Sequence, residues 1–333
     1  MKKLIAMGLS LVMAASVLVG CGAESAAKTV KVVEIELTQE EYAFGVDKTQ
    51  PELLEQVNTF VNRIKEDGTL DEICDRYFGG GEPVAVTSAE LDESKDQLLV
   101  ATNAAFEPFE YMKGDSYYGI DMEIAALLAE KLGKELVISN MDFDSVCLSV
   151  GQQKCDIAMA GLTVNEERKE YVTFTTSYYN ASQKLIAAAA DTAFDACTTV
   201  EECEAVLKAL PEGTKIGYQT GTTGAYYIDG DADWGFEGFA NLEGVGFTSG
   251  AFAVQDILQR SRRHDPSAVI GHQNAFMLLQ AQDIRIRSGK KLRSGIGFTI
   301  HENHHRHRQM PCVRIIIVCS AGIVFATEQD TLR

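Results

Sequence analysis

The sequence predicts an α/β protein built of two lobes. Its 333 residues are enough for about two domains, and an apolar content of 46% is sufficient for packed cores. From residue 97 onward, short strand-like runs alternate with helical segments, which is typical of a sheet with helical crossovers. A second run of this alternation begins near residue 190, so we place the boundary between the lobes within residues 187–196.

The first part of the chain combines an extended segment with two helices. Residues 30–46 are rich in β-branched side chains and predict extended structure. Pro51 begins a helix whose apolar residues recur every three to four positions, and Thr69 caps a shorter helix. The glycines at 79–81 break the chain, and residues 82–96 are expected to form an acidic linker.

The remaining elements follow from residue type and spacing. Strands are expected where aliphatic residues cluster, and helices where apolar residues repeat at helical spacing. The expected strands are residues 98–101, 135–139, 156–160, 183–190 and 215–218. The expected helices are residues 120–132, 144–150, 200–210 and 249–258, and another opens at 221–223.

Charge is distributed unevenly along the chain. The whole sequence has 30 basic and 48 acidic side chains, a net charge of −18, which argues against binding nucleic acid or an anionic membrane through the protein surface. Residues 1–259 carry a net charge of −25. Residues 260–333 carry +7 and hold all six histidines and ten of the thirteen arginines. This tail differs in composition from the rest of the chain.

The N-terminus has the pattern of an export signal. Residues 1–20 join a Met-Lys-Lys start to a short apolar segment, which indicates a signal peptide rather than a membrane span. The Leu-x-Gly-Cys sequence ending at Cys21 resembles the lipobox of bacterial lipoproteins, in which the cysteine is the lipidated first residue. It implies a tether over residues 21–29 and an acyl anchor at the extracytoplasmic face of the cell membrane. A plain signal peptide is the alternative.

Disulfides are permitted in that compartment. Cys147 with Cys155, and Cys197 with Cys203, are close enough in sequence to pair. Buried free thiols are the alternative, because spacing alone assigns no bridge.

Several motifs between residues 98 and 258 stand in the order found in one known family. Phe-Glu-Pro-Phe-Glu-Tyr at 106–111 follows the first of these strands, and Asp-Ile-Ala-Met-Ala-Gly-Leu-Thr at 156–163 precedes Arg168 by a short spacer. Gly-Tyr-Gln-Thr-Gly-Thr-Thr follows at 217–223. Together they resemble the polar amino acid-binding proteins of bacterial ABC importers, the extracellular solute-binding protein family 3.

The resemblance implies a fold and a function. The fold is two-lobed and periplasmic-binding-protein-like, of type II, with hinge closure over a polar amino acid near residues 183–190 and 33–37. The ligand is then delivered to an ABC transporter permease, without catalysis and without a cofactor or metal. We expect a monomer that binds no nucleic acid and meets the membrane through its lipid anchor.

The family motifs also imply how the ligand backbone is bound. Arg168 offers a planar fork of donors to the carboxylate of an amino acid. The backbone N–H groups of Thr222 and Thr223 face the same carboxylate at a helix N-terminus. The carbonyl of Gly161 and the hydroxyl of Thr163 accept from the ammonium group. The alternatives are a solvated Arg168 at a helix start and simple N-caps at the two threonines.

The ligand side chain is assigned to three further positions. Phe106 and Phe143 match family positions whose rings enclose it, and Asn103 matches a position that selects it. Ordinary core aromatics, and a turn residue at Asn103, are the alternatives.

The order of the segments departs from the family. Residues 33–81 resemble the C-terminal end of the family, which predicts a circular permutation joined through the linker 82–96. A duplicated fragment would require a second copy near the C-terminus, and the sequence has none. The predicted division is 30–35 as a crossover strand of lobe 2, 36–184 as lobe 1, 185–259 as lobe 2 and 260–333 as the atypical tail.

The tail is the second departure. The family has a strand there and an Asp that neutralises the ligand ammonium, whereas residues 269–270 lead into Gly271-His272. We infer that the tail is out of frame or otherwise foreign, which would leave lobe 2 without a strand and a ligand group and weaken or abolish binding. Its possible metal ligands match no strong zinc or nickel pattern: His301, His304, His305, His307 and Cys312. Residues 313–326 are too short for a membrane span and predict a strand pair or a poorly ordered stretch.

Three other functions compete with amino acid transport. A few proteins with this lobe pair are dehydratases of prephenate-like acids, and Glu107 is the candidate acid for such an enzyme. The ectodomain of a receptor is the second, although the sequence shows no kinase segment or transmembrane span. A binding-defective product with an incomplete lobe 2 is the third.

Overall fold

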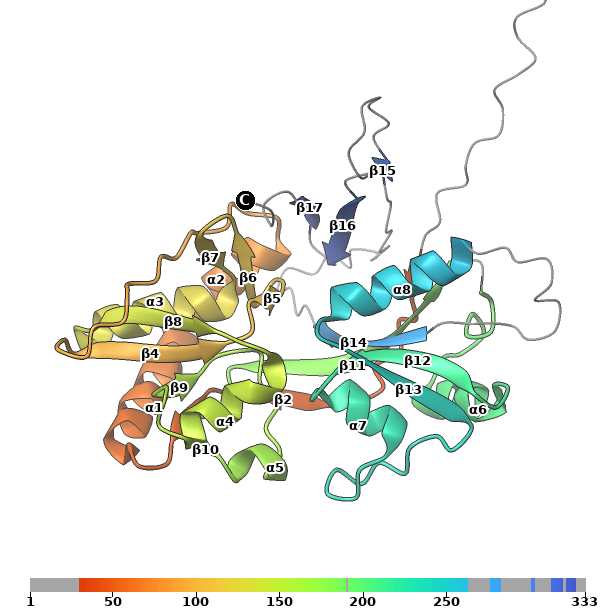
Figure 1. Cartoon of the computed structure of the whole chain (residues 1–333), viewed down its shortest axis with the longest axis horizontal. Helices are drawn as coiled ribbons and strands as arrows, with labels where there is room; N and C mark the ends of the chain where they lie inside the picture. The colour runs from red at the N-terminus through yellow and green to blue at the C-terminus, as the bar shows by residue number, and fades with distance from the viewer. Residues whose placement is uncertain are drawn as a thin grey trace, which may run out of the picture.

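The computed structural model describes residues 30–189, 191–262, 276–282, 301–302, 313–319 and 322–327. Its two lobes lie side by side, and strand β11 (Tyr179–Ala188) runs between them (Figure 1). Cys21 and the predicted export signal lie outside the described residues. Within the described ranges, no helix has the length and apolar character needed to cross a membrane.

Lobe 1 is built on a five-stranded sheet with the order β10-β3-β9-β4-β8. Strand β4 (Gln97–Thr102) pairs in parallel with β8 (Glu135–Asn140) and with β9 (Ile157–Ala158). Strand β3 (Gly45–Asp47) is antiparallel to both β9 and β10 (Val172–Phe174). Helical crossovers between parallel strands are the predicted α/β pattern. A separate small sheet holds β5 (Ala105–Phe106), β6 (Glu110–Lys113) and β7 (Ser116–Tyr118).

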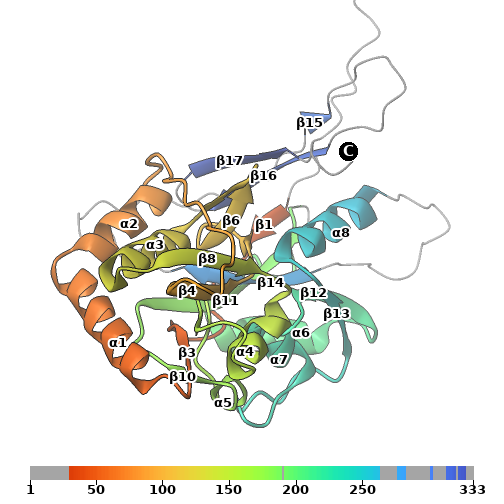
Figure 2. The same ribbon diagram turned by 60° about the vertical axis from the view of Figure 1, so that its left-hand side comes forward.

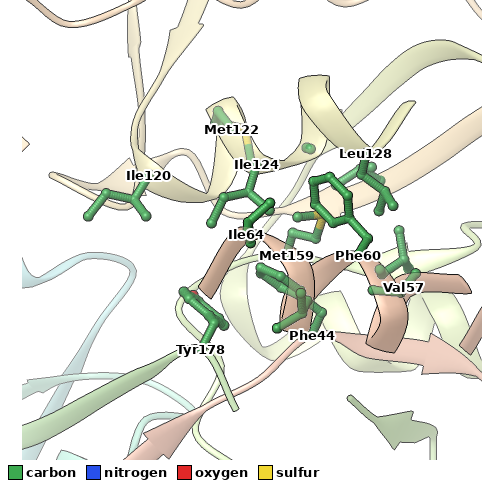
Figure 3. Close-up of a cluster of buried hydrophobic side chains, with 14 of the residues drawn as sticks. Phe44, Val57, Phe60, Ile64, Ile120, Met122, Ile124, Leu128, Met159 and Tyr178 are labelled. Carbon is green, nitrogen blue, oxygen red and sulfur yellow. The ribbon is translucent and has the colours of Figure 1, made fainter. Parts of the chain in front are cut away.

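The helices of lobe 1 begin close to the predicted positions. They are α1 (Pro51–Glu66), α2 (Thr69–Phe78), α3 (Ile120–Leu132), α4 (Val146–Gly151) and α5 (Glu166–Lys169). Figures 1 and 2 show α1, α2 and α3 on the side of lobe 1 away from lobe 2. The apolar stripe of α1 packs against α3 and the sheet, and Figure 3 shows this core: Phe44, Val57, Phe60, Ile64, Ile124, Leu128 and Met159.

Lobe 2 is built on a second sheet with the order β1-β11-β14-β12-β13. The strands other than β11 are β1 (Val30–Val32), β14 (Phe276–Gln282), β12 (Thr214–Gln219) and β13 (Leu242–Phe247). Its helices are α6 (Val200–Ala209), α7 (Thr223–Asp229) and α8 (Gly250–Arg262). The predicted fold class, α/β in two lobes, is confirmed.

The extended segment at 30–46 is divided into short strands. After β1, Val33 N–H donates to the Leu185 carbonyl oxygen, and Leu37 N–H donates to the Gln183 carbonyl oxygen. Strand β2 (Glu40–Tyr42) then pairs with the far end of β11, and β3 enters the sheet of lobe 1. The segment thus changes partner, from β11 to the sheet of lobe 1, as it crosses from one lobe to the other.

Two expectations about the tail were wrong. Lobe 2 does not lack a strand, because β14 lies between β11, to which it is antiparallel, and β12, to which it is parallel. The expectation that no Asp follows an apolar strand also fails, since β14 is followed in the sequence by Asp283, which is outside the described residues. The predicted strand pair is present as β16 (Val313–Cys319) and β17 (Gly322–Thr327), with β15 (His301–Glu302) on β16. The origin of the tail stays a prediction.

The cysteines of the two candidate disulfides are free thiols in the structure. Cys147, Cys155 and Cys203 are buried, and Cys197 is partly buried. Burial raises the pKa of the Cys155 thiol and, to about 12, that of Cys203.

Two carboxyl groups, those of Asp121 and Glu110, are fully buried in lobe 1. Asp121 accepts hydrogen bonds from the Tyr178 hydroxyl (2.6 Å) and the Gly161 N–H (2.9 Å). Burial raises the pKa of Asp121 to about 7. Burial also raises the pKa of Glu110 well above its usual value, with a smaller contribution from the charge of Asp121. Neither oxygen of Glu110 has a hydrogen-bond partner among the described residues.

These carboxyls predict a pH dependence of stability. A carboxyl whose pKa is higher in the folded state favours unfolding as the pH rises between its two pKa values. For Asp121 this window runs from 3.8 to about 7, so the free energy of unfolding should fall across it. Glu110→Gln should make the fall shallower in urea titrations at several pH values. The control Glu170→Gln, at an exposed position, should leave the fall of the unfolding free energy with pH unchanged. If Glu110→Gln also leaves it unchanged, the raised pKa assigned to Glu110 is contradicted.

A side chain in place of Gly119, which directly precedes α3, is expected to lower the free energy of unfolding for steric reasons. Its φ is +124°, and a Cβ there would overlap the carbonyl oxygen of Phe109. Gly114 also has a positive φ, +59°, but a Cβ there would lie in open space. We expect Gly114→Ala to cost about 1–2 kcal/mol in chemical unfolding, and Gly119→Ala to cost distinctly more. Equal costs would show that the Phe109 contact is easily relieved.

Candidate ligand-binding site

Arg168 is buried at the junction of the lobes. Asn165 caps α5 by accepting from the Arg168 N–H (2.7 Å), which fixes the start of this short helix. The side chain is 7% exposed. Its Nη1 donates to the carbonyl oxygen of Thr163 (2.7 Å), and its Nη2 to that of Gly221 (2.9 Å). Because Thr163 belongs to lobe 1 and Gly221 to lobe 2, the guanidinium connects the lobes, and the solvated alternative is wrong.

The turn at 221–223 approaches Arg168 from lobe 2. Thr222 occupies the N-cap position of α7, but its side chain makes no capping bond, and its hydroxyl donates instead to the Gln219 carbonyl oxygen (2.7 Å). The Thr223 hydroxyl donates to Oε2 of Glu40 (2.9 Å). The simple N-cap alternative therefore does not describe either side chain.

The two predicted aromatic residues lie in different parts of this region. Phe143, in the 3-10 turn Phe143–Ser145, has its ring centre 5.1 Å from the guanidinium carbon of Arg168. The Phe106 ring stacks on Phe109 and borders Gly161, where an added Cβ would lie 3.0 Å from it. Both rings are only partly buried, unlike the fully buried Phe109.

Asn103 makes a contact between the lobes. Its Nδ2 donates to the Met141 carbonyl oxygen (2.7 Å), within lobe 1. Its Oδ1 accepts from Nε2 of Gln219 in lobe 2 (3.1 Å). Asn103 is therefore more than a turn residue.

Glu40 was not predicted as a site residue. Its side chain is buried, and four side chains donate to its carboxylate: Thr38 (2.6 Å), Thr163 (2.6 Å), Gln183 (2.9 Å) and Thr223 (2.9 Å). Glu40 and Thr163 are 123 positions apart in the sequence, so no local pattern joins them. Gln183 and Gln219 were missed for the same reason.

The structure thus brings most predicted site residues to one junction. Arg168 and Thr163 from lobe 1 meet Gly221 and Thr223 from lobe 2. The N–H of Gly161 donates to Asp121, which is buried in lobe 1. The region contains one buried guanidinium and one buried carboxylate, which is an arrangement suited to a small zwitterion. Among the residues that the structure describes, no group of three or more His, Cys, Asp or Glu is arranged to hold a metal ion.

Comparison with known proteins identifies the family to which the chain is similar. Residues 98–310 match the family of bacterial extracellular solute-binding proteins, family 3. The chain is 36% identical over 95 residues to the arginine-binding extracellular protein ArtP of Bacillus subtilis, covering 28% of this chain and 37% of that protein. It is 32% identical over 103 residues to a cyclohexadienyl dehydratase of Pseudomonas aeruginosa, covering 28% and 38%. The chain therefore spans little more than a third of the length of these two relatives.

A solved structure of an ancestral arginine-binding protein bound to arginine is 26% identical, covering 56% of this chain and 70% of that one with a TM-score of 0.43. The family match itself covers well over half of the sequence and runs past residue 260, where the composition changes. The chain belongs to the bacterial extracellular solute-binding proteins, family 3.

Proposed function

We propose that this protein binds a polar amino acid between its lobes on the extracytoplasmic side and delivers it to the permease of an ABC importer. The observation that carries the proposal is the buried guanidinium of Arg168, bonded to carbonyl oxygens of both lobes. A ligand carboxylate would take the place of these acceptors with two parallel charge-assisted bonds. Helix α7 has only seven residues, so Thr222 and Thr223 would add local N–H donors rather than the field of a long helix.

Arginine is the first ligand to test. The similar ArtP is named as an arginine-binding protein. The net charge of −25 on residues 1–259 would raise the local concentration of a cationic amino acid. Phe106 and Phe143 would cover the aliphatic part of its side chain, and Asn103 would accept from its polar end.

The proposal includes a tether and a hinge. Lipidation at Cys21 would hold a monomer at the extracytoplasmic face, beside the permease. The hinge would lie at residues 183–190 and 33–37, which are joined by the bonds of Val33 and Leu37 to β11. The circular permutation is supported by residues 33–81, which stand before the matched region yet contribute β2, β3, α1 and α2.

Dehydration of a prephenate-like acid is the second candidate. Burial raises the pKa of Glu107 to about 7, which suits a general acid at neutral pH, and one similar protein is named as a cyclohexadienyl dehydratase. Formation of product from such an acid by the purified protein, lost in Glu107→Gln, would favour the enzyme. The similar proteins are mainly named as binding proteins, so binding is the first proposal.

A thermal-shift screen against the twenty standard amino acids tests the proposed function. A ligand present at a hundred times its dissociation constant should add about 2.7 kcal/mol to stability. We expect arginine or another polar amino acid to raise Tm, whereas apolar amino acids should not. If no amino acid does so, the binding-defective alternative is supported.

Arg168→Lys tests the role of the guanidinium. Lysine keeps the charge but loses the planar fork, so we expect at least about 30-fold weaker binding of the selected amino acid in calorimetry. The matched control is Lys169→Gln, at an exposed neighbour whose ammonium pairs with Glu166. Unchanged affinity in Arg168→Lys would place the ligand carboxylate elsewhere.

A further inference from the structure

We propose that Glu40 provides the counter-charge for the ammonium group of the bound amino acid; this inference rests on the proposed function. Glu40 begins β2, which lies beside β11 between the lobes (Figure 1). Its side chain is 4% exposed. A carboxylate at such a position is costly unless hydrogen bonds or an opposite charge compensate for its lost hydration.

The donors to Glu40 come from every part of the junction. Oε1 accepts from the Thr38 hydroxyl (2.6 Å), in the crossover segment, and from Nε2 of Gln183 (2.9 Å), in β11. Oε2 accepts from the hydroxyls of Thr163 (2.6 Å), in lobe 1, and Thr223 (2.9 Å), in lobe 2. Oε2 is thus the carboxylate oxygen held by both lobes.

The same two segments hold both Arg168 and Glu40. In lobe 1, the carbonyl oxygen of Thr163 accepts from Arg168 while its hydroxyl donates to Glu40. In lobe 2, Gly221 accepts from Arg168 and Thr223, two residues later, donates to Glu40. A buried cation and a buried anion therefore share Thr163 as a hydrogen-bond partner and are contacted by the same turn of lobe 2. An α-amino acid has its carboxylate and ammonium groups on a single carbon, so its two opposite charges match the polarity of this pair.

The threonine hydroxyls allow Glu40 to accept from a ligand ammonium group in place of a hydroxyl. A hydroxyl can donate to Glu40 and can also rotate to accept from an ammonium group. On binding, the ammonium would donate to Oε2 of Glu40 and to the hydroxyl of Thr163, forming a charge-assisted pair shielded from water. Glu40 would then fill the role that the family resemblance assigns to an Asp of lobe 2, but from a segment near the start of the chain.

Paired ligands test this assignment. The probes are L-arginine and δ-guanidinovalerate, which lacks only the α-amino group, or the equivalent pair for the amino acid that stabilises the protein most. We expect the native protein to prefer the amino acid. Glu40→Gln should weaken binding of the amino acid by at least about 30-fold while changing binding of the deaminated analogue by less than about threefold. Calorimetry measures both affinities.

Three variants complete the experiment. Glu41→Gln alters the exposed neighbour and should keep both affinities, whereas Glu40→Asp keeps the charge and should keep the preference for the amino acid. If Glu40→Gln does not fold, as judged by circular dichroism, loss of the preference in Glu40→Asp would overturn the proposal. Asp283→Asn tests the acid that follows β14; if it removes the preference, the counter-charge is Asp283.

The results separate the two proposals. Equal weakening of both probes in Glu40→Gln, or no weakening, would overturn the role of Glu40 while leaving amino acid binding intact. Equal affinity of the native protein for both probes would also overturn the role of Glu40 and leave amino acid binding intact. If the native protein binds no amino acid, the proposed function fails and the role of Glu40 fails with it.

Discussion

The junction between the lobes is governed by the cost of burying two opposite charges. Arg168 and Glu40 are both largely removed from water, and each needs polar partners in place of hydration. Those partners come from both lobes, because Thr163 contacts both groups and the Gly221–Thr223 turn contacts both from the other side. The position of one lobe against the other is therefore tied to the hydrogen bonding of these two side chains.

The beginning of the chain is essential to this arrangement. It supplies Glu40 to the junction, and two positions later Tyr42 enters the core of lobe 1. Phe44 then stacks on Tyr178, with ring centres 4.4 Å apart. Within β2, Glu40 and Tyr42 are buried and Glu41 between them is exposed, so the segment that packs into lobe 1 also places a buried charge at the junction.

Side chains in the core of lobe 1 also support the junction. Asp121 accepts from the Gly161 N–H and the Tyr178 hydroxyl, so a buried carboxyl of α3 fixes the loop that precedes Thr163. Tyr178 in turn contacts Phe44 from the N-terminal segment. The loop, the helix and the N-terminal strands are therefore held as one unit, as the proposed binding site would require.

The sequence alone determined the α/β class and nearly every helix, because periodicity and turn residues are local. It also predicted Arg168, Thr163, Thr222 and Thr223 as site residues, since a family motif fixes residue type and spacing, and the structure places Arg168, Thr163 and Thr223 in the contacts between the lobes. It did not identify Glu40, Gln183 or Gln219, and it missed β14. The residues around one of many acidic side chains do not indicate which groups it will contact in the fold. Strand pairing likewise depends on segments that are distant in the sequence. Only the tertiary structure brought Glu40 to Thr163 across 123 positions, because burial and hydrogen bonding are properties of the assembled lobes.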